Sequence, residues 1–298
     1  MIRTPKVSVI ITTYNRYKLL DRAINSVLLQ TYRNMEIVIV DDNSSDNTES
    51  IIKKYMEKDN RINFIKHKEN MGLSAARNTG FKNSIGELIA YLDDDDEWLP
   101  EKLEQQVNKM LDSSEKNLGL IYCWMNYYKG KEIVRERHTK LKGNIFEYSL
   151  DRQPIGNGST WLICRSVLED IGGFDERLPR GIDGDFIRRM SIKNYSVDYV
   201  PKVLIRYYVE HGKQRITRSD NQGLINALYC ENDKLQKFKC ELDRYSKQKS
   251  NIYSNIAYIY SQLGDKGKFS KFTLKAIKIK FHNKSIYLNF FRGLKNFI

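Results

Sequence analysis

The chain has 298 residues and a formal net charge of +13 at pH 7, a length that accommodates one large α/β domain or a domain with an appendage. No apolar stretch reaches the roughly 18 residues of a membrane-spanning helix, and the N-terminus leads directly into a strand pattern, so we expect neither a transmembrane span nor a secretory signal. The four cysteines lack metal-type and redox-type spacing, which favours reduced thiols in a cytoplasmic protein.

The first 110 residues alternate between strand and helix patterns. Apolar runs predict buried strands at residues 7–12, 37–40 and 88–92, and a further short strand is predicted at residues 62–65. Apolar residues at helical spacing predict helices at residues 19–28, 47–56, 73–84 and 100–110. Asp46 is expected to cap the second helix, and Pro100 opens the fourth. Alternation of this kind predicts a parallel sheet with helices on both faces.

Beyond residue 118 the pattern becomes mixed. Strands are predicted at residues 120–128, 131–137, 161–164 and 200–208. The first two of these fit an antiparallel pair, and a helix is predicted at residues 184–195. We expect this half of the chain to hold whatever is specific to a second substrate.

Polar side chains follow three of the predicted parallel strands. Residues 12–15 follow the first, residues 41–44 the second, and four consecutive aspartates, Asp93 to Asp96, follow the fourth. Open α/β sheets bind ligands at the carboxyl ends of their strands, so we expect one site fed by three loops. Four adjacent like charges need water or a cation to neutralise them, and Mg²⁺ and Mn²⁺ prefer oxygen ligands. For the run in isolation, a solvated acidic turn is an equal alternative.

Five segments carry recognisable motifs, at residues 7–15, 40–46, 73–78, 91–96 and 172–176. They resemble the family-two glycosyltransferases, which are nucleotide-sugar-dependent and mostly inverting enzymes, and they occur in that family's order and spacing across about residues 5–212. The resemblance implies an α/β protein of the GT-A fold, with a Rossmann-like, mostly parallel central sheet and flanking helices. The GT-A domain is expected at residues 1–215, with a nucleotide-sugar-binding half at 1–117 and an acceptor-binding half at 118–215.

The resemblance divides the aspartate run into roles. Asp93 and Asp95 match the family's Asp-x-Asp motif, which implies Mn²⁺ or Mg²⁺ with Asp95 as the direct ligand. Asp94 is expected at the ribose hydroxyls of the donor, and Asp96 is expected only to support the loop. Because all four residues are acidic, the register of the motif is ambiguous by one residue.

Other positions match the family's nucleotide pocket. Thr12 and Tyr14 correspond to residues that line it, and Asp42 corresponds to the carboxylate that reads the base. A carboxylate accepts the N3–H of uracil, a donor that cytosine lacks, which implies a UDP-sugar. Arg77 resembles the arginine that faces the nucleotide and its diphosphate, and a guanidinium suits phosphate geometry.

The catalytic base and one further metal ligand are assigned downstream. Asp183 matches the carboxylate that takes the acceptor hydroxyl's proton in inverting transfer, although the Glu that commonly precedes it in the family is absent. Asp185 is interpreted as an N-terminal helix cap. His211 corresponds to a region where many relatives carry a metal-binding histidine, with an exposed loop histidine as the equal alternative.

The positive charge is concentrated at the C-terminal end. Residues 211–298 hold 18 Lys and Arg against 6 Asp and Glu, a surplus of 12 that leaves only +1 for the rest. This shift predicts a separate basic helical C-terminal region at residues 216–298, with two amphipathic helices around residues 264–267. Peripheral contact with the inner face of the plasma membrane is one interpretation. A solvated lysine-rich face over a homo-oligomer interface is another, and no motif indicates nucleic-acid binding.

The sequence thus predicts a cytoplasmic, inverting, metal-dependent hexosyl- or N-acetylhexosaminyl-transferase. It would move a sugar from a UDP-sugar to a saccharide or lipid-linked saccharide acceptor in surface polysaccharide synthesis. A nucleotidyltransferase-like protein is one alternative, although residues 13–16 lack the glycine of a phosphate loop. A catalytically idle nucleotide-sugar or saccharide-binding protein is another. A receiver domain is disfavoured because no aspartate follows the third strand.

Overall fold

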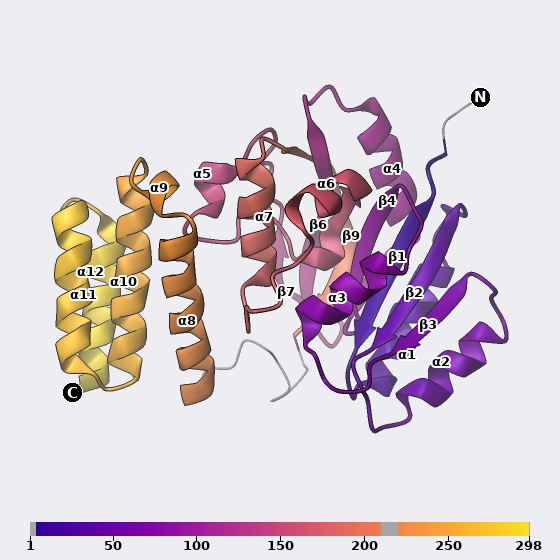
Figure 1. Ribbon diagram of the computed structural model, residues 1–298, viewed down its shortest axis with the longest axis horizontal. Coiled ribbons are helices and arrows are strands. Elements are labelled where there is room, and N and C mark those ends of the chain that lie inside the picture. Colours follow the sequence, from indigo (N-terminus) through magenta and orange to yellow (C-terminus); the bar gives the residue numbers. More distant parts are fainter. Residues whose placement is uncertain (1–3, 210–219, 298) are drawn as a thin grey trace. The chain divides into compact units, whose positions relative to one another are not determined.

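The computed structural model describes residues 4–209 and 220–297 (Figure 1). The chain forms two compact units. The sheet unit comprises Met1–Ile145, Pro154–Arg177 and Phe186–His211, and the helical unit comprises Phe146–Gln153, Leu178–Asp185 and Gly212–Ile298. The boundary expected near residue 215 stays a prediction, and two short segments that precede it belong to the helical unit.

All strands of the described chain lie in the sheet unit. They are β1 (Val7–Thr13), β2 (Met35–Asp41), β3 (Ile62–Lys66), β4 (Leu88–Asp93), β5 (Asp96–Trp98), β6 (Leu118–Lys129), β7 (Glu132–Arg137), β8 (Trp161–Cys164) and β9 (Ser196–Tyr208). Their order is β3-β2-β1-β4-β8-β6-β9-β5, with β7 paired to β6. The first four strands run parallel, β6 and β9 are parallel, and β5, β7 and β8 pair antiparallel with their neighbours.

The predicted buried strands are confirmed, and one strand was missed. Every residue of β1 and β2 is buried, as expected for strands covered on both faces. β5 was not predicted because it is short and begins inside the aspartate run. Only Asp94 and Asp95 separate β4 from β5, yet β5 pairs with β9 at the far end of the strand order. The sheet therefore curls back on the carboxyl end of β4.

Helices cover the sheet as the sequence pattern predicts (Figure 1). They are α1 (Tyr17–Leu28), α2 (Thr48–Met56), α3 (Leu73–Lys82), α4 (Lys102–Asp112), α6 (Arg165–Ile171) and the 3-10 turn η1 (Gly158–Thr160). The periodic apolar residues of α1 are buried against the sheet. Helix α7 (Ile182–Ile192) begins in the helical unit and continues into the sheet unit.

The helical unit has a core of its own. Its helices are α5 (Phe146–Ser149), α8 (Asn221–Lys237), α9 (Lys239–Leu242), α10 (Ser246–Gln262), α11 (Lys266–Ile279), α12 (Lys284–Leu294) and the 3-10 turn η2 (Lys295–Phe297). The core consists of Leu150, Phe238, Leu242, Ile252 and Ile256. Gly264, with φ +78°, makes the predicted turn between α10 and α11. In the part of the chain that the structure describes, no helix combines the length and apolar character needed to cross a bilayer.

Candidate active site

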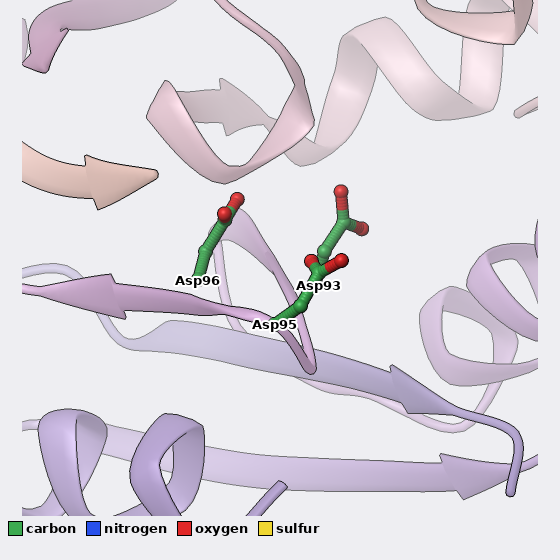
Figure 2. Close-up of side chains that lie close together, drawn as sticks. All are labelled: Asp93, Asp95 and Asp96. Atoms are coloured by element: carbon green, nitrogen blue, oxygen red, sulfur yellow. The ribbon is translucent and has the colours of Figure 1, made fainter. Parts of the chain in front are cut away.

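Three carboxylates meet where β4 ends and β5 begins (Figure 2). Oxygen atoms of Asp93, Asp95 and Asp96 all lie within 4.8 Å of one another. Asp93 and Asp95 are partly exposed, whereas Asp96 is buried. Asp96 was expected only to support the loop, but the structure places its carboxylate with those of the two predicted metal ligands. The fold brings it there because β5 turns back immediately after Asp95.

The surroundings of Asp96 fit a divalent cation. Its Oδ2 atom accepts a hydrogen bond from Nδ2 of Asn157 at 3.1 Å. Its buried Oδ1 atom has no hydrogen-bond partner among the described residues. Burial, together with the charges of Asp95 and Asp93, raises the pKa of Asp96 well above its ordinary value. A buried acceptor without a donor, inside a group of carboxylates, is the environment that an oxygen-preferring cation satisfies.

Asp94 lies in a different environment from its three neighbours. Its Oδ2 accepts a hydrogen bond from Oγ1 of Thr13 at 2.8 Å, and its Oδ1 pairs with Nη1 of Arg16 at 3.1 Å. Burial, and secondarily the charge of Asp95, raises the pKa of Asp94 to about 7, while Arg16 opposes the shift. The sequence predicts that Asp94 reaches the ribose of the donor. In the structure its carboxylate is buried and binds Thr13 at the end of β1 and Arg16 at the start of α1.

Arg16 and Arg22 also bind the aspartate loop. Arg16 immediately precedes α1 and Arg22 lies on it, and neither was predicted from the sequence as a site residue. Nη1 of Arg16 also lies 3.1 Å from Oδ2 of Asp95. Nη2 of Arg22 donates to the backbone oxygen of Asp95 at 2.8 Å, and its guanidinium lies 3.8 Å from the ring centre of Tyr208. The position of Asp95 is therefore fixed through both its side chain and its backbone.

Arg77, on α3, orients Asp93 through an ion pair. Its buried guanidinium pairs through Nη2 with Oδ1 of Asp93 at 2.7 Å and lies 5.0 Å from the ring centre of Phe174. The 3-10 turn η1 passes so close that a Cβ atom on Gly158 would lie 2.9 Å from Nη2 of Arg77. The predicted diphosphate-facing arginine is thus held against the aspartate run by an ion pair and close packing.

The motifs at residues 73–78 and 172–176 form one structural unit. Oδ1 of Asn78 accepts from the backbone N–H of Phe174 at 2.8 Å, and Nδ2 of Asn78 donates to the backbone oxygen of Phe174 at 2.9 Å. Gly173 has φ +72°, and a Cβ atom there would lie 2.5 Å from Oδ1 of Asn78. A glycine is therefore required for this turn to approach α3, the helix that carries Arg77.

Asp42 lies at the carboxyl end of β2 inside a hydrogen-bonded network. Its Oδ1 accepts from the backbone N–H of Met71 at 2.8 Å, and its Oδ2 accepts from that of Gly72 at 2.8 Å. Nδ1 of His67 lies 2.8 Å from Oδ1, and Nε2 of His67 lies 2.9 Å from Oγ1 of Thr79. His67 was not predicted as a site residue. The only feature of the sequence that could have indicated it is its position directly after β3.

The loops after β1 and β2 are hydrogen-bonded to each other. The backbone N–H of Asn15 donates to Oγ of Ser44 at 2.8 Å, and the backbone N–H of Ser45 donates to Oδ1 of Asn15 at 2.8 Å. Asn15 has φ +52°, a conformation that asparagine tolerates better than most residues. Of the two predicted pocket residues beside this contact, Thr12 is buried and Tyr14 is exposed.

The downstream acidic positions belong to the helical unit. Asp183 is partly exposed in the first turn of α7, where the helix N-terminus favours a carboxylate. Asp185 is buried and pairs with Nζ of Lys237 at 2.6 Å. It lies inside the first turn rather than before it, so its interpretation as the helix cap is wrong. His211, the remaining predicted metal ligand, lies outside the described residues.

Comparison with solved structures identifies the fold. The chain is similar to Staphylococcus aureus TarS 1-349, solved in complex with UDP-GlcNAc, with a TM-score of 0.65 and 18% identity over 98% of this chain and 80% of that one. It is also similar to a mannosyltransferase of Pyrobaculum calidifontis, solved with GDP-Man and Mn²⁺, with a TM-score of 0.63 and 18% identity over 99% and 86% of the two chains. The predicted GT-A fold is confirmed by these likenesses.

Sequence comparisons give relatives that are named as glycosyltransferases. An uncharacterized glycosyltransferase of Methanocaldococcus jannaschii is 31% identical over 74% of this chain and 77% of its own length. One of Rickettsia conorii is 34% identical over 78% of this chain, which spans only 38% of that longer protein. The Escherichia coli UDP-Glc:α-D-GlcNAc-diphosphoundecaprenol β-1,3-glucosyltransferase WfgD is 40% identical over 43% of this chain and 49% of its own length.

A family match covers most of the motifs described above. Residues 8–172, which include the strand ends and the three-carboxylate cluster, match glycosyl transferase family 2. The matched residues also include Asn78 and the Arg77–Asp93 pair, and they make up more than half of the chain. The chain therefore belongs to glycosyl transferase family 2.

Proposed function

We propose that this glycosyltransferase is inverting and metal-dependent, and that it transfers a hexose or N-acetylhexosamine from a UDP-sugar to a saccharide acceptor. The single observation that carries the metal dependence is the cluster of Asp93, Asp95 and Asp96, with its buried, unbonded Oδ1 atom. These residues would hold Mn²⁺ or Mg²⁺. When bound, such an ion supplies Lewis-acid stabilisation of the charge that develops on a departing diphosphate.

The residues around the cluster are proposed to position it. Arg77 holds Asp93, and Arg16 and Arg22 hold the side chain and backbone of Asp95. Pre-positioned carboxylates need not reorganise when the donor binds, which is the condition for electrostatic catalysis. Three positive side chains also limit the mutual repulsion of the aspartates before a cation arrives.

The donor base is proposed to bind beside Asp42. Each carboxylate oxygen has two lone pairs, and Oδ2 of Asp42 accepts one hydrogen bond from a described donor, that from Gly72. Oδ2 therefore retains the capacity to accept the N3–H of uracil. Tyr14 offers an exposed ring for stacking on a base at the neighbouring strand end.

Asp183 is proposed as the general base. Inverting transfer needs a carboxylate that removes the proton of the acceptor hydroxyl as its oxygen attacks the anomeric carbon. Asp183 is partly exposed in the first turn of α7, where the partial positive charge of the helix N-terminus favours a nearby carboxylate. The transition state would have oxocarbenium character, as in glycoside chemistry generally.

A lipid-linked saccharide is the proposed acceptor. WfgD is named for transfer to a sugar carried on diphosphoundecaprenol, and a lipid-linked acceptor would place the enzyme at the inner face of the plasma membrane. A role in surface polysaccharide synthesis follows from that class of acceptor. Association of the chain into a homo-oligomer stays a prediction from the sequence.

UDP release from a panel of UDP-sugars, measured with and without EDTA, tests the donor and metal proposals together. We expect release to need Mn²⁺ or Mg²⁺ and to fall by about 10³-fold or more in Asp95→Ala. Asp183→Asn should lose transfer and keep UDP binding, because the amide cannot accept the proton. Full turnover by Asp95→Ala in EDTA would exclude the metal role. UDP binding without turnover of any donor would favour the catalytically idle alternative.

A further inference from the structure

The C-terminal helix pair α11–α12 has an outer face that mixes bulky apolar and basic side chains. On α12, Ile286 and Gly293 are buried and define the inner side. The opposite side, two residues out of phase, carries Leu288 and Phe291, which are 58% and 62% exposed. Leu274 on α11 is 57% exposed in the same way, opposite the buried Ala276.

Basic residues stand next to each of these apolar positions. On the outer side of α11 they are Lys271 and Lys278, which flank Leu274 at helical spacing, and at the two ends of α12 they are Lys284 and Lys295. All four are exposed. From residue 266 to residue 298 the sequence has nine Lys and Arg and no Asp or Glu. The outward side of each helix, together the outer face of the pair, therefore carries only positive charges, with apolar side chains between them.

The two helices are packed tightly enough to hold this face in place. The rings of Phe269 and Phe290 stack with centroids 5.7 Å apart. A Cβ atom on Gly293 would lie 2.7 Å from the ring of Phe269, so a glycine is needed for this approach. The apolar residues of the outer face are thus exposed because the inner side of each helix is already occupied, and not because the helices are loosely placed.

We propose that the outer face of α11–α12, centred on Leu274, Leu288 and Phe291, docks on the surface of a bilayer that contains anionic lipids. Basic side chains would meet the headgroups, and the apolar ones would enter the boundary with the acyl chains. This assignment rests on exposure and charge within the helical unit and does not depend on the proposed catalytic chemistry.

The observations favour a bilayer over two other occupants. A second copy of the chain in a two-fold interface would bring the same uniformly positive face against itself, which like-charge repulsion opposes. A nucleic acid would neutralise the lysines but would leave Leu288 and Phe291 without an apolar environment. A bilayer with anionic headgroups satisfies both kinds of side chain at once.

Vesicle co-sedimentation of the full chain tests the proposal. We compare vesicles of phosphatidylcholine with vesicles that contain about 30% phosphatidylglycerol, whose negative surface potential attracts basic segments. The wild type should sediment with the anionic vesicles and stay in the supernatant with the neutral ones. Leu288→Ser/Phe291→Ser should lower the partition coefficient by about tenfold or more. Lys271→Gln/Lys278→Gln should lower it by about 25-fold, at roughly fivefold for each lysine.

The chain offers a matched control for the apolar variant. Ile133 and Val134 on β7 are each 50% exposed and lie outside the helical unit. Ile133→Ser/Val134→Ser removes similar apolar surface and should leave vesicle binding unchanged. Circular dichroism melts of all variants establish that each is folded, which the exposure of the substituted side chains leads us to expect.

Five outcomes would overturn the proposal. The first three are equal binding to neutral and anionic vesicles, unchanged binding of Leu288→Ser/Phe291→Ser, and equal losses in this variant and the β7 control. The fourth is a dimer that Leu288→Ser/Phe291→Ser dissociates without any effect on vesicle binding, which would make this face an interface between copies. The fifth is competition by duplex DNA with no effect of the apolar variant, which would assign the lysines to a polyanion instead. UDP release without vesicles reports on the catalytic proposal separately.

Discussion

Nδ1 of His67 lies 2.8 Å from Oδ1 of Asp42, and this contact joins the ends of two neighbouring parallel strands. Both side chains are largely buried. Asp42 also accepts hydrogen bonds from the backbone of Met71 and Gly72, the residues that lead into α3. The proposed base-reading carboxylate is therefore fixed by three donors and aligned before a nucleotide arrives.

Removing His67 is expected to weaken UDP binding. In His67→Ala, Asp42 loses one partner and can rotate away from the position set by the loop, so we expect UDP affinity to fall about tenfold. His67→Asn keeps a donor near the place of Nδ1 and should recover part of the loss. Isothermal titration with UDP measures both variants. His138→Ala is the control. His138 follows β7 and bonds to Asn126 on β6, so its removal should leave UDP affinity unchanged.

The stability of the metal-free protein is expected to fall as pH rises through neutrality. Burial raises the pKa of Asp94 to about 7 and that of Asp96 well above its ordinary 3.8. Groups whose pKa is raised by folding add stability while protonated and lose it as pH passes the folded value. We therefore expect the melting temperature without metal to drop by about 5 °C or more between pH 5 and pH 8.

Mn²⁺ should reverse this trend, because binding to carboxylates competes with protons. The rise in melting temperature on adding Mn²⁺ is expected to be larger at pH 8 than at pH 5, as scanning fluorimetry can show. Asp96→Asn removes one buried charge, so it should flatten the metal-free profile and reduce the Mn²⁺ effect. A Mn²⁺ effect that is independent of pH, or unaltered in Asp96→Asn, would contradict the assignment of this carboxylate to the cluster.

Gly158→Ala is expected to impair the site without unfolding the protein. The new Cβ would lie 2.9 Å from Nη2 of Arg77, whose guanidinium is held by Asp93 and by the ring of Phe174. Displacement of Arg77 should release Asp93 and lower the transfer rate by about tenfold or more. Gly267→Ala, on α11 with only a distant neighbour for its Cβ, is the matched control and should keep full activity. Equal rates for the two variants would argue against a positioning role for Arg77.

Lys102 gives the protein a second pH dependence, of opposite sign. It is fully buried on α4, where Nζ donates to the backbone oxygen of Trp161 at 3.1 Å and lies 3.7 Å from the ring centre of Trp98. Burial lowers the pKa of Lys102 from 10.5 to about 7. Because the unfolded chain then binds the extra proton between pH 7 and 10, this residue makes stability rise with pH in that range.

Urea denaturation of wild type and Lys102→Met between pH 7 and 9.5 measures this contribution. As pH rises, the free energy of unfolding of the wild type should increase relative to that of the variant by up to about 1.4 kcal/mol per pH unit. The measurement is made on one variant across pH, so any constant effect of the substitution on packing cancels. Parallel pH profiles for the two proteins would show that Lys102 stays charged in the folded state.

The parts of the fold that local sequence encodes were predictable. β1 and β2 could be recognised because their runs of Val and Ile are typical of strands that are covered on both faces, and every one of their residues is indeed buried. The contact of Asp95 with Arg16, in the segment after β1, followed from the shared edge of a parallel sheet. The role of glycine at residue 173 became clear only from its contact with Asn78.

The parts that depend on distant pairing were not predictable. Asn157 bonds to Asp96, which is 61 residues away, and Arg22 bonds to the backbone of Asp95, which is 73 residues away. Neither residue has a local pattern that indicates a partner. The burial of Asp94 and Asp96, in contrast with Asp93 and Asp95, depends on β5 turning back to pair with β9. Four consecutive aspartates carry no local signal that distinguishes the buried ones from the exposed ones.

The mutual hydrogen bonds between Asn15 and the serines at 44 and 45 have a consequence for the kinetics of the site. Neither loop can lift away from the sheet without breaking bonds that the other loop supplies, so the two should open together. Their amide protons would then exchange with solvent at a common rate. A nucleotide could then enter only when the loops after β1 and β2 open at the same time. Its association would be slower, and its bound state longer-lived, than if the two loops opened independently.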